Sequence, residues 1–228
     1  MRKPRPASIF LSALLILPLF APPSALAGEK AKAKENAGWA ESLASWFEGW
    51  GDSFAEAWDG PKRTAAPFKW TGHVAAGKTV EVRGVNGRIR ATTASGNDVE
   101  VVALRSGRRS DPEAVKIDVV QHAGGVTICA VYPSRDASNP NVCKPGGGGM
   151  RVRNNDVNVE FEVRVPKDVA FEGRTVNGGI EADVEGAAAV STVNGGIEVE
   201  ASSLTEATTV NGSIRASVRA DRAGKEDI

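Results

Sequence analysis

A six-residue motif that returns at a fixed interval is the strongest constraint on the fold of this chain. Thr175-Val176-Asn177-Gly178-Gly179-Ile180 recurs 17 residues later as T-V-N-G-G-I and, after 17 more residues, as T-V-N-G-S-I. An earlier relative of the motif, G-V-N-G-R-I, begins at Gly84. A fixed short period indicates that one structural unit is stacked on itself.

The alternation within each copy distinguishes two folds. An Asn-Gly pair usually forms a hairpin turn, but a hairpin at Asn177-Gly178 would place Arg174 and Glu181 on the face of Val176. An extended chain instead keeps its apolar residues on one face, which favours an all-β, β-solenoid-like repeat domain with parallel coils. A β-sandwich of hairpins is the alternative. The predicted inward residues of the first copy are Val176, Gly178, Ile180, Ala182 and Val184.

The stacking predicts two sets of site residues, with Asn and Thr in columns between coils. The repeat turns are Asn86, Gly87, Asn177, Gly178, Asn194, Gly195, Asn211 and Gly212. The candidate partner surface is the outward set Thr175, Asn177, Glu181, Thr192, Asn194, Glu198, Thr209, Asn211 and Arg215.

Short alternating runs separated by turn residues extend the β prediction over the domain 67–228. The Gly-rich sequence Ala123-Gly124-Gly125 is typical of a hairpin turn. The expected strands outside the repeats are 79–83, 98–104, 115–120, 126–131 and 157–165.

Residues 1–27 are predicted to be a cleaved export signal. Three basic residues precede an apolar run over Ile9–Phe20, which is short for a membrane span, and Ala25-Leu26-Ala27 provides a small-x-small cleavage pattern. An uncleaved anchor is the alternative. Loss of the three basic residues leaves 25 basic against 28 acidic residues, a net charge of −3. Without a basic excess, nucleic-acid binding is not expected.

Cys129 and Cys143 are the chain's two cysteines. In an exported protein they are expected to form a structural disulfide. Redox-active pairs usually have C-x-x-C spacing, which these cysteines lack. Closing a loop of about 15 residues contributes about 3 kcal/mol in the chain-entropy account.

Residues 28–66 are predicted to contain a leader and a Trp-rich amphipathic helix over 39–58. Trp39, Trp46, Trp50 and Trp58 recur at helical spacing, opposite an acidic face. Membrane-surface helices usually carry basic residues there, so we expect this helix to cap the β domain. The alternative is binding of a partner or of a membrane, and membrane contact is expected only through this helix.

The sequence over Phe68–Val218 resembles a widespread bacterial family. The resemblance rests on the export signal, G-V-N-G-R-I, C-A-V-Y-P with C-K-P-G-G-G-G, V-N-V-E-F-E-V-R-V-P and the T-V-N-G-x-I repeats. It is the "putative adhesin" family of exported β-strand-repeat proteins, a domain of unknown function. The resemblance implies a right-handed β-solenoid-like fold and no established enzyme activity. Chains of this family commonly continue through further repeats, whereas this sequence ends in the polar stretch 221–228.

The function expected from the sequence is that of a non-catalytic cell-envelope protein, in the periplasm, at the cell surface or secreted. Its partner is an unknown envelope protein or glycan, and no cofactor, metal or catalytic residue is expected. A carbohydrate-active hydrolase or lyase is the alternative, because outward carboxylates are present. No Trp, Tyr or Phe follows Phe171 to provide a platform for a sugar ring.

Overall fold

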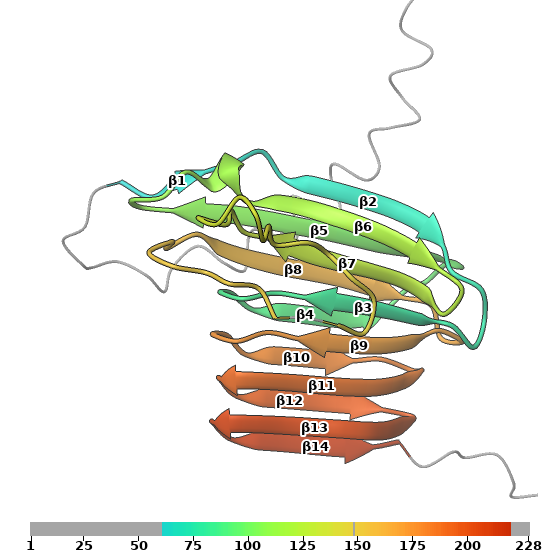
Figure 1. Cartoon of the computed structure of the whole chain (residues 1–228). Helices are drawn as coiled ribbons and strands as arrows, with labels where there is room; N and C mark the ends of the chain where they lie inside the picture. The colour runs from blue at the N-terminus through green and yellow to red at the C-terminus, as the bar shows by residue number, and fades with distance from the viewer. Residues whose placement is uncertain (1–60, 148, 220–228) are drawn as a thin grey trace, which may run out of the picture. The chain divides into compact units, whose positions relative to one another are not determined.

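The computed structural model describes residues 61–147 and 149–219, which fall within the second of two compact units, Trp58–Ile228. These residues form two β-sheets and a short 3-10 helix, Pro112–Ala114 (Figure 1). The larger sheet has the order β1 (Arg63–Thr64), β5 (Asp98–Gly107), β8 (Asn158–Val165), β4 (Ile89–Thr93), β10 (Ile180–Asp183), β12 (Ile197–Ala201) and β14 (Ile214–Val218), and β2 (Phe68–His73) also pairs with β5. The smaller sheet has the order β13 (Ser203–Asn211), β11 (Ala187–Asn194), β9 (Ala170–Arg174), β3 (Thr79–Arg83), β7 (Gly125–Val131) and β6 (Lys116–His122).

The repeats stack in parallel, as their period predicts. Ile180 of β10 pairs with Ile197 of β12, and Ile197 pairs with Ile214 of β14. In the smaller sheet Thr192 pairs with Thr209. Each copy of the motif therefore contributes one strand to each sheet and lies directly beside the next copy (Figure 1).

The early motif copy forms a further coil in the same stack. β3 and β4 lie against β9 and β10, and Ile89 pairs with Ile180. Asn86 forms an isolated parallel bridge with Asn177, 91 residues further along the chain. Between these two coils the chain inserts β5, β6, β7 and β8, in which β5–β8 and β6–β7 are antiparallel. Both sheets are therefore mixed.

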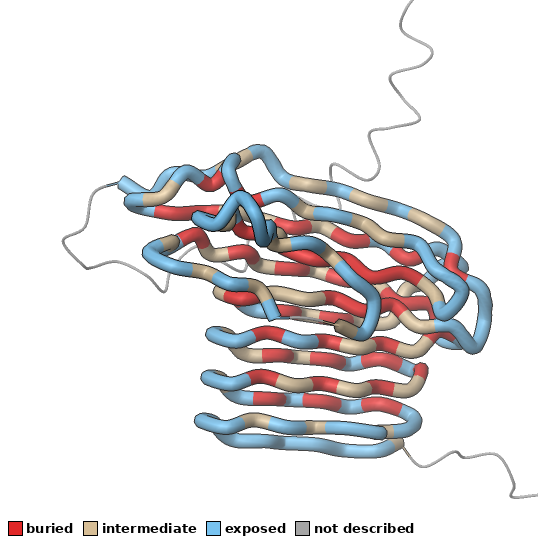
Figure 2. Tube along the Cα trace, viewed as in Figure 1, coloured by how far each residue is buried: buried red, intermediate tan, exposed pale blue. Residues whose placement is uncertain are grey.

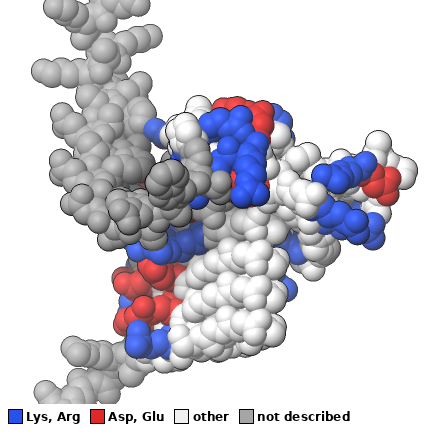
Figure 3. Space-filling view, turned by 90° about the vertical axis from the view of Figure 1, so that its left-hand side faces the viewer, with Lys and Arg blue, Asp and Glu red and all other residues white. Residues whose placement is uncertain are grey.

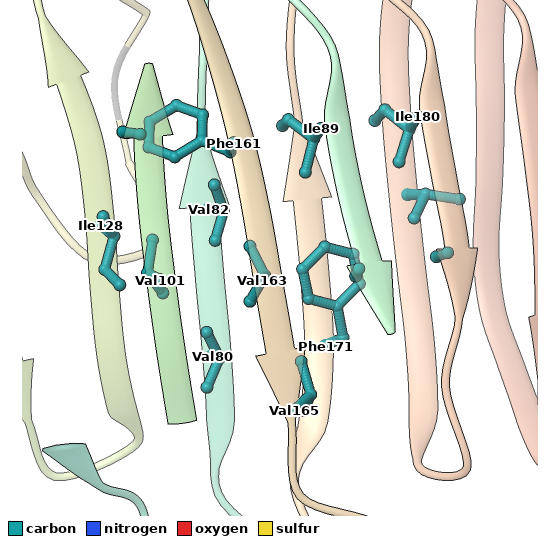
Figure 4. Close-up of a cluster of buried hydrophobic side chains, with 14 of the residues drawn as sticks. Val80, Val82, Ile89, Val101, Ile128, Phe161, Val163, Val165, Phe171 and Ile180 are labelled. Atoms are coloured by element: carbon teal, nitrogen blue, oxygen red, sulfur yellow. The ribbon is translucent and has the colours of Figure 1, made fainter. Parts of the chain in front are cut away.

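Alternation within the strands places the core between the two sheets. β8 alternates buried and half-buried residues along its whole length. Figure 2 shows the same alternation in most strands, and Figure 4 shows Phe161 and Phe171 among valine and isoleucine side chains of both sheets. The β-branched residues that dominate this core also favour extended backbone. The predicted strand runs and the turn at Ala123-Gly124 are confirmed.

The prediction that alternation continues through the repeat turns was wrong. Thr175 and Thr192 are buried, whereas Val176 and Val193 are 38% and 39% exposed. Strict alternation requires an even number of residues between two inward positions, but Thr175 and the next inward residue, Ile180, are five residues apart. The chain reverses direction at this corner as it passes from one sheet to the other. The buried hydroxyls are satisfied, since Thr192 Oγ1 donates to the Gly178 carbonyl at 2.9 Å.

The first glycine of each N-G-x-I corner lies against the backbone of a neighbouring strand or coil. A Cβ on Gly178, Gly195 or Gly212 would lie 2.0–2.1 Å from the carbonyl oxygen of the equivalent glycine in the preceding coil. At Gly87 the corresponding contact is with Val159 O at 2.2 Å. A side chain at any of these positions would hold the coils apart, so the close stacking requires glycine.

Two predictions concern residues outside the described range: the signal peptide 1–27 and the helix 39–58. β1 pairs with β5 and lies within the segment 28–66 that was expected to precede the β domain. Within the described ranges, no helix has the length and apolar character needed to cross a membrane.

Candidate functional site

The corner asparagines form a continuous ladder along one side of the stack. Asn177 Nδ2 donates to Asn86 Oδ1 at 2.9 Å, Asn194 Nδ2 to Asn177 Oδ1 at 2.8 Å, and Asn211 Nδ2 to Asn194 Oδ1 at 2.8 Å. These amides are the predicted column. Because Asn177 and Asn194 each use both the amide oxygen and the amide nitrogen between coils, we assign the ladder primarily to holding the coils in register.

The candidate partner surface divides into three parts. Thr175 and Thr192 are buried and Thr209 is half-buried, so the prediction that the threonines face outward is corrected. Asn177, Asn194 and Asn211 are exposed at the corners. Glu181, Glu198 and Arg215 lie on the outward face of the larger sheet, away from the corners, as predicted.

Two columns of polar and charged side chains run down this outward face. Cross-strand register gives Glu162, Arg90, Glu181, Glu198 and Arg215 as the first column. The second is Arg164, Thr92, Asp183, Glu200 and Ser217. Figure 3 shows the carboxylates as an acidic patch with basic groups on both sides. We call Glu181, Asp183, Glu198 and Glu200, with the arginines that flank them, the charged face.

Arginines hold the carboxylates of the charged face in place. Arg90 Nη2 lies 2.6 Å from Glu181 Oε2, and Arg88 Nη1 lies 3.5 Å from the other oxygen. Arg219 contacts both Asp183 and Glu200, and Arg215 lies 3.8 Å from Glu198. Like charges on neighbouring strands repel one another, and these cations offset that repulsion. The result is a central group of four carboxylates with arginines at both ends, held by ion pairs on the sheet.

The surface between the columns is hollowed. A shallow depression of about 370 Å³ is lined by side chains of β4, β10, β12 and β14, including Arg90, Asp183, Glu200 and Ser217. The lining combines charged and polar groups with small apolar residues and contains no aromatic residue, so the depression offers hydrogen bonds and charges to a ligand but no stacking platform.

Glu162 lies at the upper end of the first column and is the most perturbed acid there. Burial raises its pKa from 4.5 to about 6, and repulsion from Glu181 and Glu160 acts in the same direction, against attraction by Arg90. Between pH 4.5 and 6 the folded state therefore holds a proton that the unfolded state has lost. The Glu162 contribution to stability is present at pH 4.5 and is lost as the pH rises to 6.

We predict that Glu162→Gln removes this pH dependence. The shift corresponds to about 2 kcal/mol, and partial exposure of the carboxyl reduces the expected effect to about 1 kcal/mol. The unfolding free energy of the variant relative to the wild type should rise by that amount between pH 4 and pH 7, measured by urea denaturation. A difference that is independent of pH would contradict the assignment.

A loop covers part of the outward face of the smaller sheet. The predicted disulfide between Cys129 of β7 and Cys143 is confirmed, and it fastens the loop between β7 and β8 across β3 and β7. Gly146 N donates to Glu81 Oε2 at 3.0 Å, and Arg83 donates to the Lys144 carbonyl at 3.2 Å. Tyr132, at the start of the loop, donates to Val157 O at 2.8 Å, and burial raises its pKa to about 12.

Because of this loop, the outward faces of the two sheets differ in their exposure to solvent. Glu81 and Thr127 are outward by alternation, yet they are buried beneath the loop and hydrogen bonded to each other at 2.8 Å. The charged face of the larger sheet has no such cover from the described residues, since Asp183, Glu198 and Glu200 are exposed. Among the described residues its carboxylates are therefore open to solvent.

Sequence reasoning missed Glu162, Arg90 and Arg219. Arg90 was discoverable, because aligning G-V-N-G-R-I with the later copies places it beside Glu181. Glu162 lies outside the repeat, and its position depends on the pairing of β8 with β4. Arg219 follows β14 in the third copy, where the first two copies have Glu185 and Ser202, so the period does not predict an arginine there.

Residues 61–147 and 149–219 contain no group of three or more His, Cys, Asp or Glu placed to hold a metal ion. No protein-family model matches the chain, and no curated protein matches it. Among solved structures, the chain is similar to a "putative cell adhesion protein" from Clostridium sporogenes ATCC 15579. The identity is 14%, with coverage of 66% of this chain and 68% of that chain and a TM-score of 0.36. Membership of the adhesin family therefore stays a prediction.

Proposed function

We propose that this chain is an exported, non-catalytic binding scaffold of the cell envelope, with adhesin-like function. In this proposal the stacked coils form a right-handed β-solenoid, and its charged face binds an envelope protein or glycan. The observation that carries the proposal is the pattern of Glu181, Asp183, Glu198 and Glu200 between flanking arginines, on a sheet face that residues 61–147 and 149–219 leave exposed.

Two physical arguments support this role for the charged face. Its side chains project from parallel strands, so their spacing is set by the backbone, and a rigid surface loses little entropy on binding. Charges of both signs in a fixed order favour a partner of complementary order and repel others. The disulfide supports export, because disulfides persist in oxidising compartments.

Charge reversal on the two sheets tests the proposal. Wild-type protein, Glu198→Lys and Glu206→Lys are immobilised and incubated with the envelope fraction of the source cells, and bound proteins and glycans are quantified by mass spectrometry. Glu206 is exposed on β13 of the other sheet, so its variant matches the charge change. We expect Glu198→Lys alone to lose at least one bound component. Equal binding by all three proteins, or equal losses in both variants, would contradict the proposal.

One observation favours carbohydrate cleavage as a second candidate. Near pH 6 Glu162 is partly protonated while Glu181 is held by arginines, and glycoside hydrolysis uses one protonated and one charged carboxyl group. Incubation with cell-wall and matrix polysaccharides distinguishes the candidates. New reducing ends from the wild type, absent with Glu162→Gln, would establish the enzyme.

A further inference from the structure

The coil formed by β13 and β14 has a neighbouring coil on one side only among the described residues. Ile180 and Ile197 are 0% and 3% exposed, whereas the equivalent Ile214 is 44% exposed. Ala201 is fully buried, and its partner Val218 on β14 is 58% exposed. These apolar residues occupy inward positions by their register, so the core extends into the last described coil, where no other described residue covers it (Figure 2).

The backbone of β14 is also unpaired on its outer edge. Ser213 O accepts from Ile197 N and Arg219 N donates to Ala201 O, so residues 213, 215, 217 and 219 are directed toward β12. Polar backbone groups alternate in direction along a strand, so those of Ile214, Ala216 and Val218 are directed away from the stack. β13 forms the free edge of the other sheet at the same end (Figure 1).

We propose that this end binds a second copy of the chain, end to end, so that β14 pairs antiparallel with β14 of the partner and β13 with β13 of the partner. One twofold axis normal to the sheets relates both pairs of edges at once, whereas a single extended peptide would cover only one edge. With the axis at Ala216, the outward backbone groups of residues 214, 216 and 218 meet in three hydrogen-bonded pairs. Ile214 then lies opposite the partner's Val218, which continues the core across the interface.

The chemistry of the described edge supports this occupant. β14 contains no proline and no inward charge, although natural edge strands usually use such features to prevent pairing. Only the edges of β13 and β14 and the apolar side chains between them would be buried, so we expect less than the roughly 800 Å² per partner of stable complexes and a weak, reversible dimer.

Sedimentation velocity of the full-length exported protein tests this inference, which does not depend on the ligand of the charged face. Between about 5 and 500 µM the wild type should shift from monomer to dimer, in keeping with a small interface. Ala216→Pro removes an outward N–H without touching the ladder to β12, and it should weaken the dimer at least about tenfold. Val218→Lys should do the same by placing a charge at the interface.

Thr71→Lys, on the exposed face of β2 at the opposite end of the larger sheet, is the matched control and should leave the dimer unchanged. Circular dichroism establishes whether each variant is folded. If Ala216→Pro does not fold, Val218→Lys decides the outcome. A wild type that stays monomeric, a folded Val218→Lys that dimerises like the wild type, or a Thr71→Lys variant that does not dimerise would overturn the proposal.

Discussion

Replacement of Ile197 by aspartate is expected to unfold the coil stack, whereas Glu198→Lys next to it is expected to be almost silent. Ile197 is 3% exposed and lies between Ile180 and Ile214 of the neighbouring coils. An aspartate there would bury a charge without a partner, which should cost at least about 4 kcal/mol. Glu198 faces solvent and its ion pair with Arg215 is exposed, so its reversal should stay within about 0.5 kcal/mol.

Thermal and urea denaturation of the two variants measure this difference. Because the residues are adjacent, they share the same strand, the same coil and the same distance from the end of the stack. Similar losses of stability in both variants would show that β12 does not alternate between core and solvent as described.

Gly195→Ala is expected to destabilise the protein by about 2 kcal/mol, and Gly196→Ala by little. A Cβ at Gly195 would lie 2.1 Å from Gly178 O, which forces the coils apart, and backbone atoms cannot move aside as a flexible side chain can. At Gly196 the nearest atoms, Ser213 O and Ser213 Oγ, are 3.7 Å away, which is an ordinary contact.

The natural copies of the motif already differ at the second glycine of N-G-G-I. Ser213 and Arg88 occupy the place of Gly196 in the last and first copies, while the first glycine is present in all four. Urea denaturation of Gly195→Ala and Gly196→Ala gives the comparison directly. If Gly196→Ala were the more damaging substitution, the assignment of the close contact to the first glycine would be wrong.

The period of the repeat was sufficient to predict parallel coils, because strands 17 residues apart can align equivalent residues only by pairing in register. The same pattern was insufficient at the corners. Alternation is a property of extended backbone, and it says nothing about the residues through which the chain reverses direction. Thr175 was therefore placed outside, although its hydroxyl is buried and donates to the Gly87 carbonyl at 3.2 Å.

The charged face was predictable where it belongs to the repeat and unpredictable elsewhere. Glu181 and Glu198 follow the corner by the same number of residues, so their column could be read from the period. Glu162 joins that column only because β8 pairs with β4, a long-range pairing that leaves no local signal. The burial of Glu81 likewise depends on the position of the loop between β7 and β8, which the disulfide fixes.

The charged face exists because the coils stack in parallel with a 17-residue register. Backbone nuclear Overhauser effects in the labelled protein test this stacking most directly. Parallel coils predict contacts that join the strand of Ile180 to that of Ile197, and the strand of Ile197 to that of Ile214, with residues paired in order. Contacts between residues 176 and 179, and between 174 and 181, in place of these would establish hairpins at the Asn-Gly corners and would contradict the account.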